Sequence, residues 1–375
     1  MCAKVTANQE IKRINRTNVY HYIRANGAVS CRDIQIALGL SLPTIYQNME
    51  ELMADGLVME SGDIGNTGGR RAKTFSVVND VRVSVGLGLT KDKVTAVIVD
   101  LAGEMLICQE EHRKFERTKE YFRFLNELVQ KTLEACGIEP ERVLGVDIGL
   151  PCLTDVKNYR VTYGQIIQLT GATADEVGEY IPFPVRLIHD VYAAGVAEQW
   201  MNPDLNNAFY LLLSQTVGGA AFVGGKPYYG DWMRGGEVGH LILYPDGKQC
   251  YCGSKGCVDA YLSTDSLLDN RYADLETFFQ ALECQELSAV KSFERYVHDL
   301  ALVLRSIQLT LDCTIILGGK IGKYIGKYIW KVRNELERSY PFGLNTEYIM
   351  ACKCQAHSIP IGAALYSVQE YLDSI

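Results

Sequence analysis

The stretch EVGHLILYPDGKQCYCGSKGC, which spans residues 237–257, combines one histidine and three cysteines in a short loop-forming segment. Its candidate metal ligands are His240, Cys250, Cys252 and Cys257. One imidazole and three thiolates suit tetrahedral zinc, and the glycines at 253 and 256 allow the loop to fold back on itself. Because four protein ligands leave no open position for an activated water, the sequence predicts a structural zinc ion rather than a catalytic one.

The length and composition of the chain indicate a globular protein of two or three domains. It has 375 residues, and the shares of hydrophobic (47%) and charged (22%) residues are ordinary for a soluble protein. The first residues lack the apolar run of a secretory signal, and no stretch approaches the ~18 apolar residues of a membrane span. We therefore expect a cytoplasmic protein with no membrane partner. Its twelve cysteines are then reduced, which favours metal binding over a disulfide framework.

Charge is unevenly distributed along the chain. The formal net charge is −8, yet residues 4–32 hold six basic side chains against one glutamate, so the remainder is strongly acidic. The basic residues of this segment are Lys4, Lys12, Arg13, Arg16, Arg24 and Arg32. A basic end on an acidic body is typical of a nucleic-acid-facing module joined to a domain with other duties. A solvated basic helix would give the same pattern, so charge alone does not decide.

The N-terminal segment has the apolar spacing of three helices. The first is expected from Thr17 to a C-terminal Gly27, and the second follows Ser30, with Asp33 in its positive first turn. After a turn at 39–41, LPTIYQNMEELMADG predicts a third helix. Its expected apolar face consists of Leu42, Ile45, Tyr46, Met49, Leu52 and Met53. Its other face, near the helix N-terminus, is expected to carry Pro43, Thr44, Gln47 and Asn48.

Those four positions are the ones from which a recognition helix reaches base edges, and Thr, Gln and Asn are suitable hydrogen-bonding partners for bases. Further on, GDIGNTGGRRAKTFSVV predicts two short strands around a Gly-rich tip that bears Arg70 and Arg71. Two guanidinium groups on such a tip suit a wing that contacts phosphates or the minor groove. A surface turn with solvated charges is the alternative. Three helices and a wing in sequence favour DNA binding.

From residue 81 onward, apolar strands alternate with longer helical stretches. VRVSVGLGLTKDKVTAVIVDLAGEML predicts a strand meander with turns at 91–92 and near 103, followed by a helix over 120–136 and the buried strand RVLGVDIGLP. NAFYLLLSQTVGGAAFVGGKPYYG repeats the opening pattern, and a helix over 292–311 and the strand TIILGGKI complete the second half. Two duplicated lobes of this kind predict a ligand cleft between them.

The chain resembles the repressor, open reading frame and sugar kinase (ROK) family, and within it the transcriptional members of the xylose and N-acetylglucosamine repressor type. The motifs are GGRR at 68–71, GLP at 149–151, HDVYAAGVAE at 189–198, EVGH at 237–240, CYCGSKGCVDAYLS at 250–263 and ILGG at 316–319. The resemblance covers nearly the whole chain. It implies an N-terminal winged helix-turn-helix (mainly α) plus an α/β actin-like (ribonuclease H-like) two-lobed sugar kinase fold. The implied division is a DNA-binding domain over 1–78, a first lobe over 79–195, and a second lobe over 196–375 that carries the zinc motif and a dimerisation surface.

The resemblance also allows the phosphate-handling segments to be compared with those of the family's kinases. Those kinases open the first lobe with Asp-x-Gly-Gly-Thr, whereas residues 86–90 have Gly86 for the aspartate and Leu89 for the second glycine. Neither side chain offers an oxygen to a hard cation, and Leu89 adds bulk where a phosphate should approach. The second turn, at 214–219, lacks its first glycine, although the adenosine-side pair at 318–319 is present. Because phosphoryl transfer depends on positioning and charge neutralisation, we expect no kinase activity and no catalytic residue.

The sugar-handling positions keep their polar character. Asp190 matches the family's general base on the sugar hydroxyl, and Glu237 and His240 match its sugar-contacting Glu-x-Gly-His. Asp259 stands for the usual glutamate and His189 for the usual asparagine, which changes reach and donor pattern. The resemblance implies that these five residues bind a sugar. We expect His240 to give one ring nitrogen to zinc and to turn the other towards a sugar hydroxyl.

Three functions remain open at this point. The first is a sugar-responsive transcriptional regulator, expected to repress carbohydrate-utilisation genes, that binds operator DNA as a homodimer or a dimer of dimers. The second is an active ATP-dependent sugar kinase with an appended DNA-binding module. The third is an orphan scaffold that has lost both activities. The missing carboxylate at Gly86 favours the first over the second, and the sequence names neither the sugar nor the operator.

Overall fold

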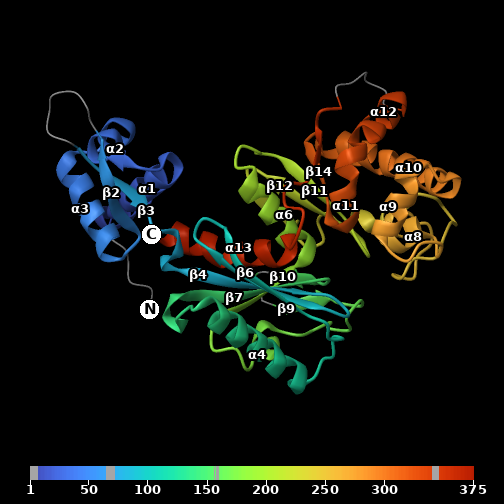
Figure 1. The fold of residues 1–375 in the computed structure, drawn as a ribbon, viewed down its shortest axis with the longest axis horizontal. Coiled ribbons are helices and arrows are strands. Elements are labelled where there is room, and N and C mark those ends of the chain that lie inside the picture. The colour runs from blue at the N-terminus through green and yellow to red at the C-terminus, as the bar shows by residue number, and fades with distance from the viewer. Residues whose placement is uncertain (1–6, 65–71, 156, 158–159, 340–345) are drawn as a thin grey trace.

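The computed structural model describes residues 7–64, 72–155, 157, 160–339 and 346–375. Its N-terminal module combines helices with a three-stranded sheet of order β1-β3-β2, at the left of Figure 1. The elements are α1 (Ala7–Asn26), β1 (Val29–Ser30), α2 (Cys31–Leu38), α3 (Leu42–Ala54), β2 (Val58–Ile64) and β3 (Ala72–Val77). Ser30 caps α2 in a reciprocal pair of hydrogen bonds with Asp33, and the Ser41 side chain caps α3. The predicted order of three helices and two wing strands is confirmed.

The start of the first helix differs from the prediction. α1 begins at Ala7 rather than at Thr17. Its first turns expose Ile11 (56%) and Ile14 (47%) to solvent, so this part of the helix has no buried stripe. Because apolar periodicity reports burial, a solvated helical extension leaves no such signal in the sequence.

The first lobe of the body contains a five-stranded sheet of order β10-β7-β4-β5-β6. β4, β5 and β6 form an antiparallel meander, and β7 and β10 continue the sheet in parallel. The elements are η1 (Asn79–Val81), β4 (Val83–Leu89), β5 (Val94–Asp100), β6 (Met105–Glu111), α4 (Lys119–Cys136), η2 (Pro140–Arg142), β7 (Val143–Leu150), β8 (Leu153–Asp155), β9 (Arg160–Tyr163), α5 (Ala174–Val177), β10 (Val185–His189) and α6 (Asp190–Met201). The predicted meander, helix and buried strand are confirmed.

The second lobe repeats this arrangement in a sheet of order β13-β12-β11-β14-β15, again a meander followed by two parallel strands. The elements are β11 (Ala208–Leu213), β12 (Val217–Val223), β13 (Lys226–Tyr228), η3 (Val238–His240), α7 (Asp259–Leu262), α8 (Thr264–Leu268), α9 (Leu275–Glu283), α10 (Leu287–Leu311), β14 (Thr314–Gly318), α11 (Gly319–Ile325), η4 (Gly326–Tyr328), α12 (Ile329–Ser339) and β15 (Ile349–Ala351). The predicted duplication of the two lobes is confirmed.

The last helix, α13 (Ser358–Ser374), returns from the second lobe to the first. It packs on β4, β5, β7 and α6, and in Figure 1 it runs along the face of the first sheet opposite α4. Successive side chains of β4 alternate between these layers, so Val85 and Leu87 join the core under α4 while Gly86 and Gly88 face α13. The predicted division into lobes over 79–195 and 196–375 does not account for the packing of this C-terminal helix on the first lobe.

The N-terminal module packs against the same end of the first lobe. One hydrophobic cluster joins Tyr20 and Ile23 of α1 to Val99 of β5 and Leu372 of α13. The guanidinium of Arg24 lies over the indole of Trp200, 4.7 Å from the ring centroid. Trp200 Nε1 donates to the Ala102 carbonyl at 2.6 Å, which fixes the indole. Among the described residues, no helix is long and apolar enough to cross a membrane.

Candidate functional site

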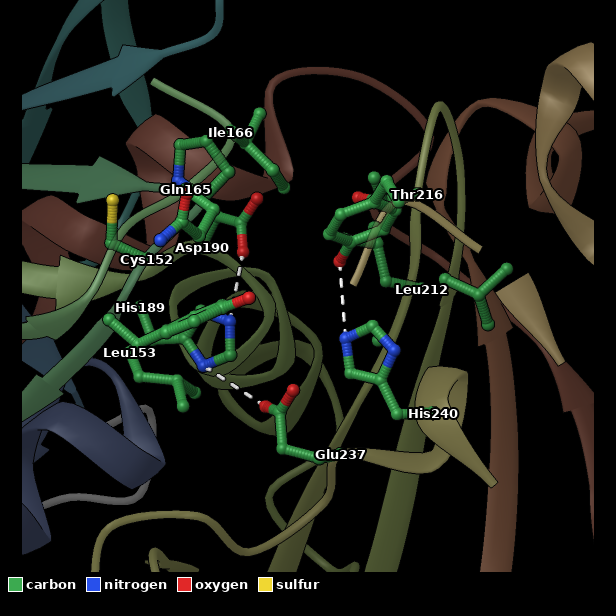
Figure 2. Close-up of a pocket in the computed structure, with 15 residues that line it drawn as sticks. Cys152, Leu153, Gln165, Ile166, His189, Asp190, Leu212, Thr216, Glu237 and His240 are labelled. Carbon is green, nitrogen blue, oxygen red and sulfur yellow. Dashed lines mark hydrogen bonds and ion pairs between the residues drawn. The ribbon is translucent and has the colours of Figure 1, made fainter. Parts of the chain in front are cut away.

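A polar cavity lies where the ends of strands from both sheets meet. β10 ends at His189, and α6 begins at once with Asp190. The second lobe contributes the β11–β12 turn and the short helix η3, which brings Glu237 and His240 to the opposite wall. Figure 2 shows His189 and Asp190 on one side of the cavity and Glu237 and His240 on the other. Carboxyl ends of parallel strands are a common place for ligand sites in α/β proteins.

The cavity is small in this conformation, with a volume of about 50 Å³. It is lined by Pro151, Cys152, Leu153, Tyr163, Gln165, Ile166, His189, Asp190, Leu212, Thr216, Val217, Gly218, Glu237, His240 and Tyr251. Because one water occupies roughly 10–15 Å³ of cavity volume, this space holds about four water molecules.

Two half-buried carboxylates flank the ring of His189. Its Nε2 lies 3.4 Å from Asp190 Oδ1, and its Nδ1 lies 4.0 Å from Glu237 Oε1. Burial raises the pKa of Asp190, and the imidazole of His189 opposes this rise. Burial also raises the pKa of Glu237, against the opposing effect of the His189 and His240 rings. Glu237 Oε1 is buried and accepts no hydrogen bond among the described residues, so it can accept one from a ligand hydroxyl.

Asp259 requires a correction to the predicted sugar set. Its side chain does not line the cavity, unlike those of the other four predicted residues. Asp259 is 6% exposed, and its Oδ1 accepts a hydrogen bond of 2.7 Å from the Val217 amide. Asp259 stands at the start of α7 and binds the β11–β12 turn through Val217. The neighbours of Val217 in that turn, Thr216 and Gly218, line the cavity. Asp259 is thus hydrogen-bonded to the wall of the cavity and is not one of its lining residues.

The four predicted metal ligands come together beside this cavity. Their ligand atoms, from His240, Cys250, Cys252 and Cys257, all lie within 4.8 Å of one another. Cys252 Sγ is 3.7 Å from Cys257 Sγ, and His240 Nδ1 is 3.9 Å from Cys250 Sγ. Around a tetrahedral zinc with Zn–S bonds of ~2.3 Å, neighbouring sulfurs are about 3.8 Å apart. The donor set and its spacing therefore fit a zinc ion.

Tyr251 stands between the metal cluster and the cavity, and the sequence analysis did not single it out. Its hydroxyl lies 3.2 Å from His240 Nε2, the ring nitrogen that faces away from the thiols. The two rings meet edge to face at 5.3 Å. His240 thus has Nδ1 near the thiols and Nε2 on the cavity side, where Tyr251 occupies it in place of a sugar hydroxyl. The position of Tyr251 between two cysteines of the motif is the only signal in the sequence.

The segment that matches the kinase phosphate turn is packed under α13. A Cβ atom placed on Gly86 would overlap the Pro360 carbonyl oxygen, and one on Gly88 would lie 2.9 Å from Pro360 Cδ. On the neighbouring strand, a Cβ on Gly149 would lie 2.6 Å from Ile359 Cγ2. The first turn of α13 therefore fills the space over these glycines, and an aspartate side chain at position 86 has no room.

The glycine pair at 318–319 also serves packing. A Cβ on Gly318 would overlap the Tyr210 hydroxyl. Gly319 has φ +81°, a conformation that favours glycine, and a Cβ there would lie 2.5 Å from the Leu213 carbonyl oxygen. The close packing of β11 against the end of β14 at Gly318 and the start of α11 at Gly319 accounts for both glycines without a nucleotide.

The surface of α3 agrees only in part with the predicted DNA-contacting face. Pro43 and Gln47 are exposed and Thr44 is half-buried, but Asn48 is only 2% exposed. Asn48 Nδ2 donates to the Thr44 carbonyl at 2.7 Å, and this side chain corrects the prediction because it faces the core. Tyr46, which was assigned to the apolar face, is 59% exposed instead.

The remaining predicted contacts cannot be placed. Arg70 and Arg71 lie outside the described residues. Among the described residues of α3, Pro43, Tyr46 and Gln47 are thus the exposed side chains on its N-terminal half that can meet a groove.

Comparisons with known proteins agree with the two parts of the chain. The ROK family profile matches residues 82–370, and a profile described as winged helix-turn-helix DNA-binding matches residues 13–59. A xylose repressor of Caldicellulosiruptor bescii is 22% identical over 96% of this chain and 97% of its own. The DNA-binding transcriptional dual regulator NagC of Escherichia coli is 24% identical over 71% of this chain and 66% of its own.

Solved structures show the same fold at low sequence identity. A ROK family transcriptional regulator, described as a homolog of the E. coli MLC protein, has a TM-score of 0.78 and 20% identity and covers 97% of both chains. A ROK family glucokinase from Streptomyces griseus, solved with glucose and AMPPNP, has a TM-score of 0.66 and 21% identity. It covers 76% of this chain and 99% of its own, so the part without a counterpart is the size of the N-terminal module.

Proposed function

The chain belongs to the ROK family, and from that premise we propose that it is a sugar-responsive transcriptional regulator, a repressor of carbohydrate-utilisation genes. Its N-terminal module binds operator DNA, and a sugar binds in the cavity between the two lobes. Two relatives that match over 97% of their own length are described as xylose repressors, which supports the proposal.

The observation that carries the proposal is the position of α6. This helix begins with Asp190 in the cavity and reaches Trp200, which lies under Arg24 of the DNA-binding module. A 12-residue helix is a stiff connection, so a shift of its first turn is transmitted to its last. A ligand changes DNA binding only if it favours one arrangement of this helix over another.

We include a structural zinc ion in the proposal, held by His240, Cys250, Cys252 and Cys257. When bound, zinc supplies a rigid cross-link of the loop rather than a reactive water, because four protein ligands complete its shell. The chain's own contribution is to orient His240, whose Nε2 then faces the cavity. The sugar contacts in this proposal are His189, Asp190, Glu237 and His240, with Asp259 behind the wall.

Kinase activity is not part of the proposal. The glucokinase likeness concerns the fold, and Pro360 lies over Gly86 where the family's kinases carry an aspartate. A homodimer is part of the proposal, because two modules with a fixed separation suit a palindromic operator.

The test is a DNA-binding assay on the full chain. Fragments from upstream of the organism's own sugar operons should give a specific complex that one unmodified sugar of a panel dissociates. Gln47→Ala should weaken the specific complex by about tenfold, because a base-edge contact contributes ~1–3 kcal/mol. Gln280→Ala, at an exposed position of α9, is the matched control and should bind normally. The absence of specific binding to any fragment would contradict the proposal.

The role of α6 is tested by removing its last contact. Trp200→Ala should leave sugar affinity within about threefold while reducing the effect of sugar on DNA binding, since coupling energies are typically ~1–3 kcal/mol. Trp232→Ala, whose side chain is 85% exposed, is the control and should respond as the unaltered protein does. A Trp200→Ala protein with full sugar response would show that another route couples the sites.

A further inference from the structure

The ionisable side chains around the cavity are two acids and two histidines, apart from cysteine and tyrosine. Among the described residues that line it, Asp190 and Glu237 are acids, and there is no lysine or arginine. Both carboxylates are largely withdrawn from solvent, with side chains 13% and 29% exposed. His189 lies between them and is the group closest to both, so the basic partner in the cavity is already engaged by two acids.

Backbone amides at the cavity are also occupied. The β11–β12 turn could offer the Val217 amide to an anion, but Asp259 Oδ1 accepts it at 2.7 Å. The N-terminus of α6 would favour an anionic ligand, but its first turn carries the Asp190 carboxylate. A turn amide and a helix N-terminus bind phosphate in many α/β folds. Here a carboxylate of the protein itself occupies each of them, Asp259 at the turn and Asp190 at the helix.

Glu237 Oε1 lies 4.0 Å from His189 Nδ1, which is too far for a hydrogen bond, so this oxygen still needs a donor. It is buried and accepts no hydrogen bond among the described residues. A sugar hydroxyl or an ammonium group can donate to it, whereas a phosphate or carboxylate group at neutral pH brings acceptors.

Resting on the proposed function, we propose that this cavity selects a non-anionic sugar, neutral or amino-substituted, and rejects sugar phosphates and uronic acids. The physical basis is charge in a site of low effective dielectric. An added anion a few ångströms from two carboxylates, with no lysine or arginine to offset them, is repelled strongly, while hydroxyl groups satisfy the same oxygens.

The experiment is isothermal titration of the full, metal-loaded chain with matched probes that differ in charge. The probes are glucose, glucosamine, glucose 6-phosphate, glucuronate, N-acetylglucosamine, N-acetylglucosamine 6-phosphate and xylose. We expect at least one non-anionic probe to bind, and each anionic probe to bind about tenfold or more weakly than its parent sugar. An anionic probe that binds as tightly as its parent or more tightly would overturn the inference and leave the proposed function intact. Failure of every probe, anionic or not, would instead count against sugar sensing itself.

A variant that supplies the missing cation gives an independent test. Gln165 is exposed, lines the cavity and lies beside Asp190 in Figure 2. Gln165→Lys should tighten binding of the 6-phosphate of the sugar that binds by about tenfold, because a cation then faces the added anion. Gln280→Lys, which adds the same charge on α9, should not change it. If Gln165→Lys leaves the ratio of parent to phosphate affinity unchanged, charge does not set the selectivity and the inference fails.

Discussion

The two five-stranded sheets of the body share one strand order, but their equivalent strands have different surroundings. In the first lobe, β4 presents Gly86 and Gly88 to the first turn of α13, and Pro360 fills that space; we term this the filled side. In the second lobe, the β11–β12 turn lies beside the cavity and is held from behind by Asp259. We term the cavity residues His189, Asp190, Glu237 and His240 the polar side.

This difference shows that equivalent strands of one topology can serve different purposes: β4 packs against α13, whereas the β11–β12 turn borders the cavity, to which the first lobe also contributes His189 and Asp190. Small residues at alternate positions of β4 allow a helix backbone to approach the sheet closely. Polar residues on the other side leave a buried oxygen without a partner, which a well-packed core avoids. The two sides can therefore be altered separately, and the following variants test whether they are independent.

The largest effect is expected from breaking the metal cluster behind the polar side. Cys257→Ser removes a buried thiolate, so the loop should lose its metal and the free energy of unfolding should fall by roughly 5 kcal/mol or more. Sugar affinity should fall with it, because His240 loses its anchor. Metal analysis, denaturant unfolding and titration with sugar measure the three quantities.

The matched control for this variant is Cys284→Ser, since that cysteine is exposed and lies outside the cluster. It should retain metal and stability. A metal-free Cys257→Ser protein with unchanged sugar affinity would show that the cluster and the polar side are not linked.

A carboxylate on the filled side should be strongly destabilising. Gly86→Asp places side-chain atoms on the Pro360 carbonyl, and overpacking with a buried charge should lower the free energy of unfolding by about 4 kcal/mol. ATP turnover should not appear. Gly326→Asp, where a Cβ meets nothing closer than 3.5 Å, is the control. A stable Gly86→Asp protein that hydrolyses ATP with sugar would contradict the description of this side as filled.

The free energy of unfolding should depend on pH through Asp147, which lies where α13 packs on the first sheet. Asp147 is fully buried between Ser84, Arg186 and Ser367 of α13, and burial raises its pKa to about 6 from 3.8. A raised acid pKa means that the folded state holds the proton more tightly, so this contribution to stability is fully present below pH 4. It is lost as pH rises through about 6, and the difference is about 3 kcal/mol.

Denaturant unfolding at a series of pH values measures this contribution. Relative to the unaltered protein, Asp147→Asn should gain stability as pH rises from about 4 to about 6. Glu370→Gln, at the exposed carboxylate that also contacts Arg186, should leave the slope unchanged. Parallel pH profiles for the unaltered protein and Asp147→Asn would show that this acid is not perturbed.

Features governed by neighbours in sequence could be predicted. The cysteine loop is local, because only nine residues separate His240 from Cys250 and glycines with positive φ occupy positions 253 and 256. The caps at Ser30 and Ser41 and the meander turns are local in the same sense. The alternation of β4 was also visible, although its glycines had been interpreted through phosphate binding rather than through the helix that covers them.

Features set by distant segments could not be predicted. Asn48 is an exception, because local spacing already places it on the buried stripe, three residues after Ile45 and four before Leu52; the prediction was wrong because it followed the polarity of the side chain. Asp259 was assigned to the sugar by analogy, but the Val217 amide, far away in sequence, donates a hydrogen bond to its carboxylate and directs it to the turn. Neither the return of α13 nor the place of Tyr251 follows from periodicity, because both depend on how the lobes meet.

The smallest expected effect concerns Tyr251, which lines the cavity beside His240 of the polar side. Tyr251→Phe removes the hydroxyl that lies 3.2 Å from His240 Nε2, so a sugar hydroxyl no longer competes with it. Because one net hydrogen bond contributes ~0.5–1.5 kcal/mol, sugar affinity should tighten by about threefold, with metal content unchanged. Tyr244→Phe, whose ring lies outside the cavity and whose hydroxyl donates to Asp299, is the control for loss of a tyrosine hydroxyl. Weakening of sugar binding by Tyr251→Phe, rather than tightening, would mean that the hydroxyl contacts the ligand instead of occupying its place.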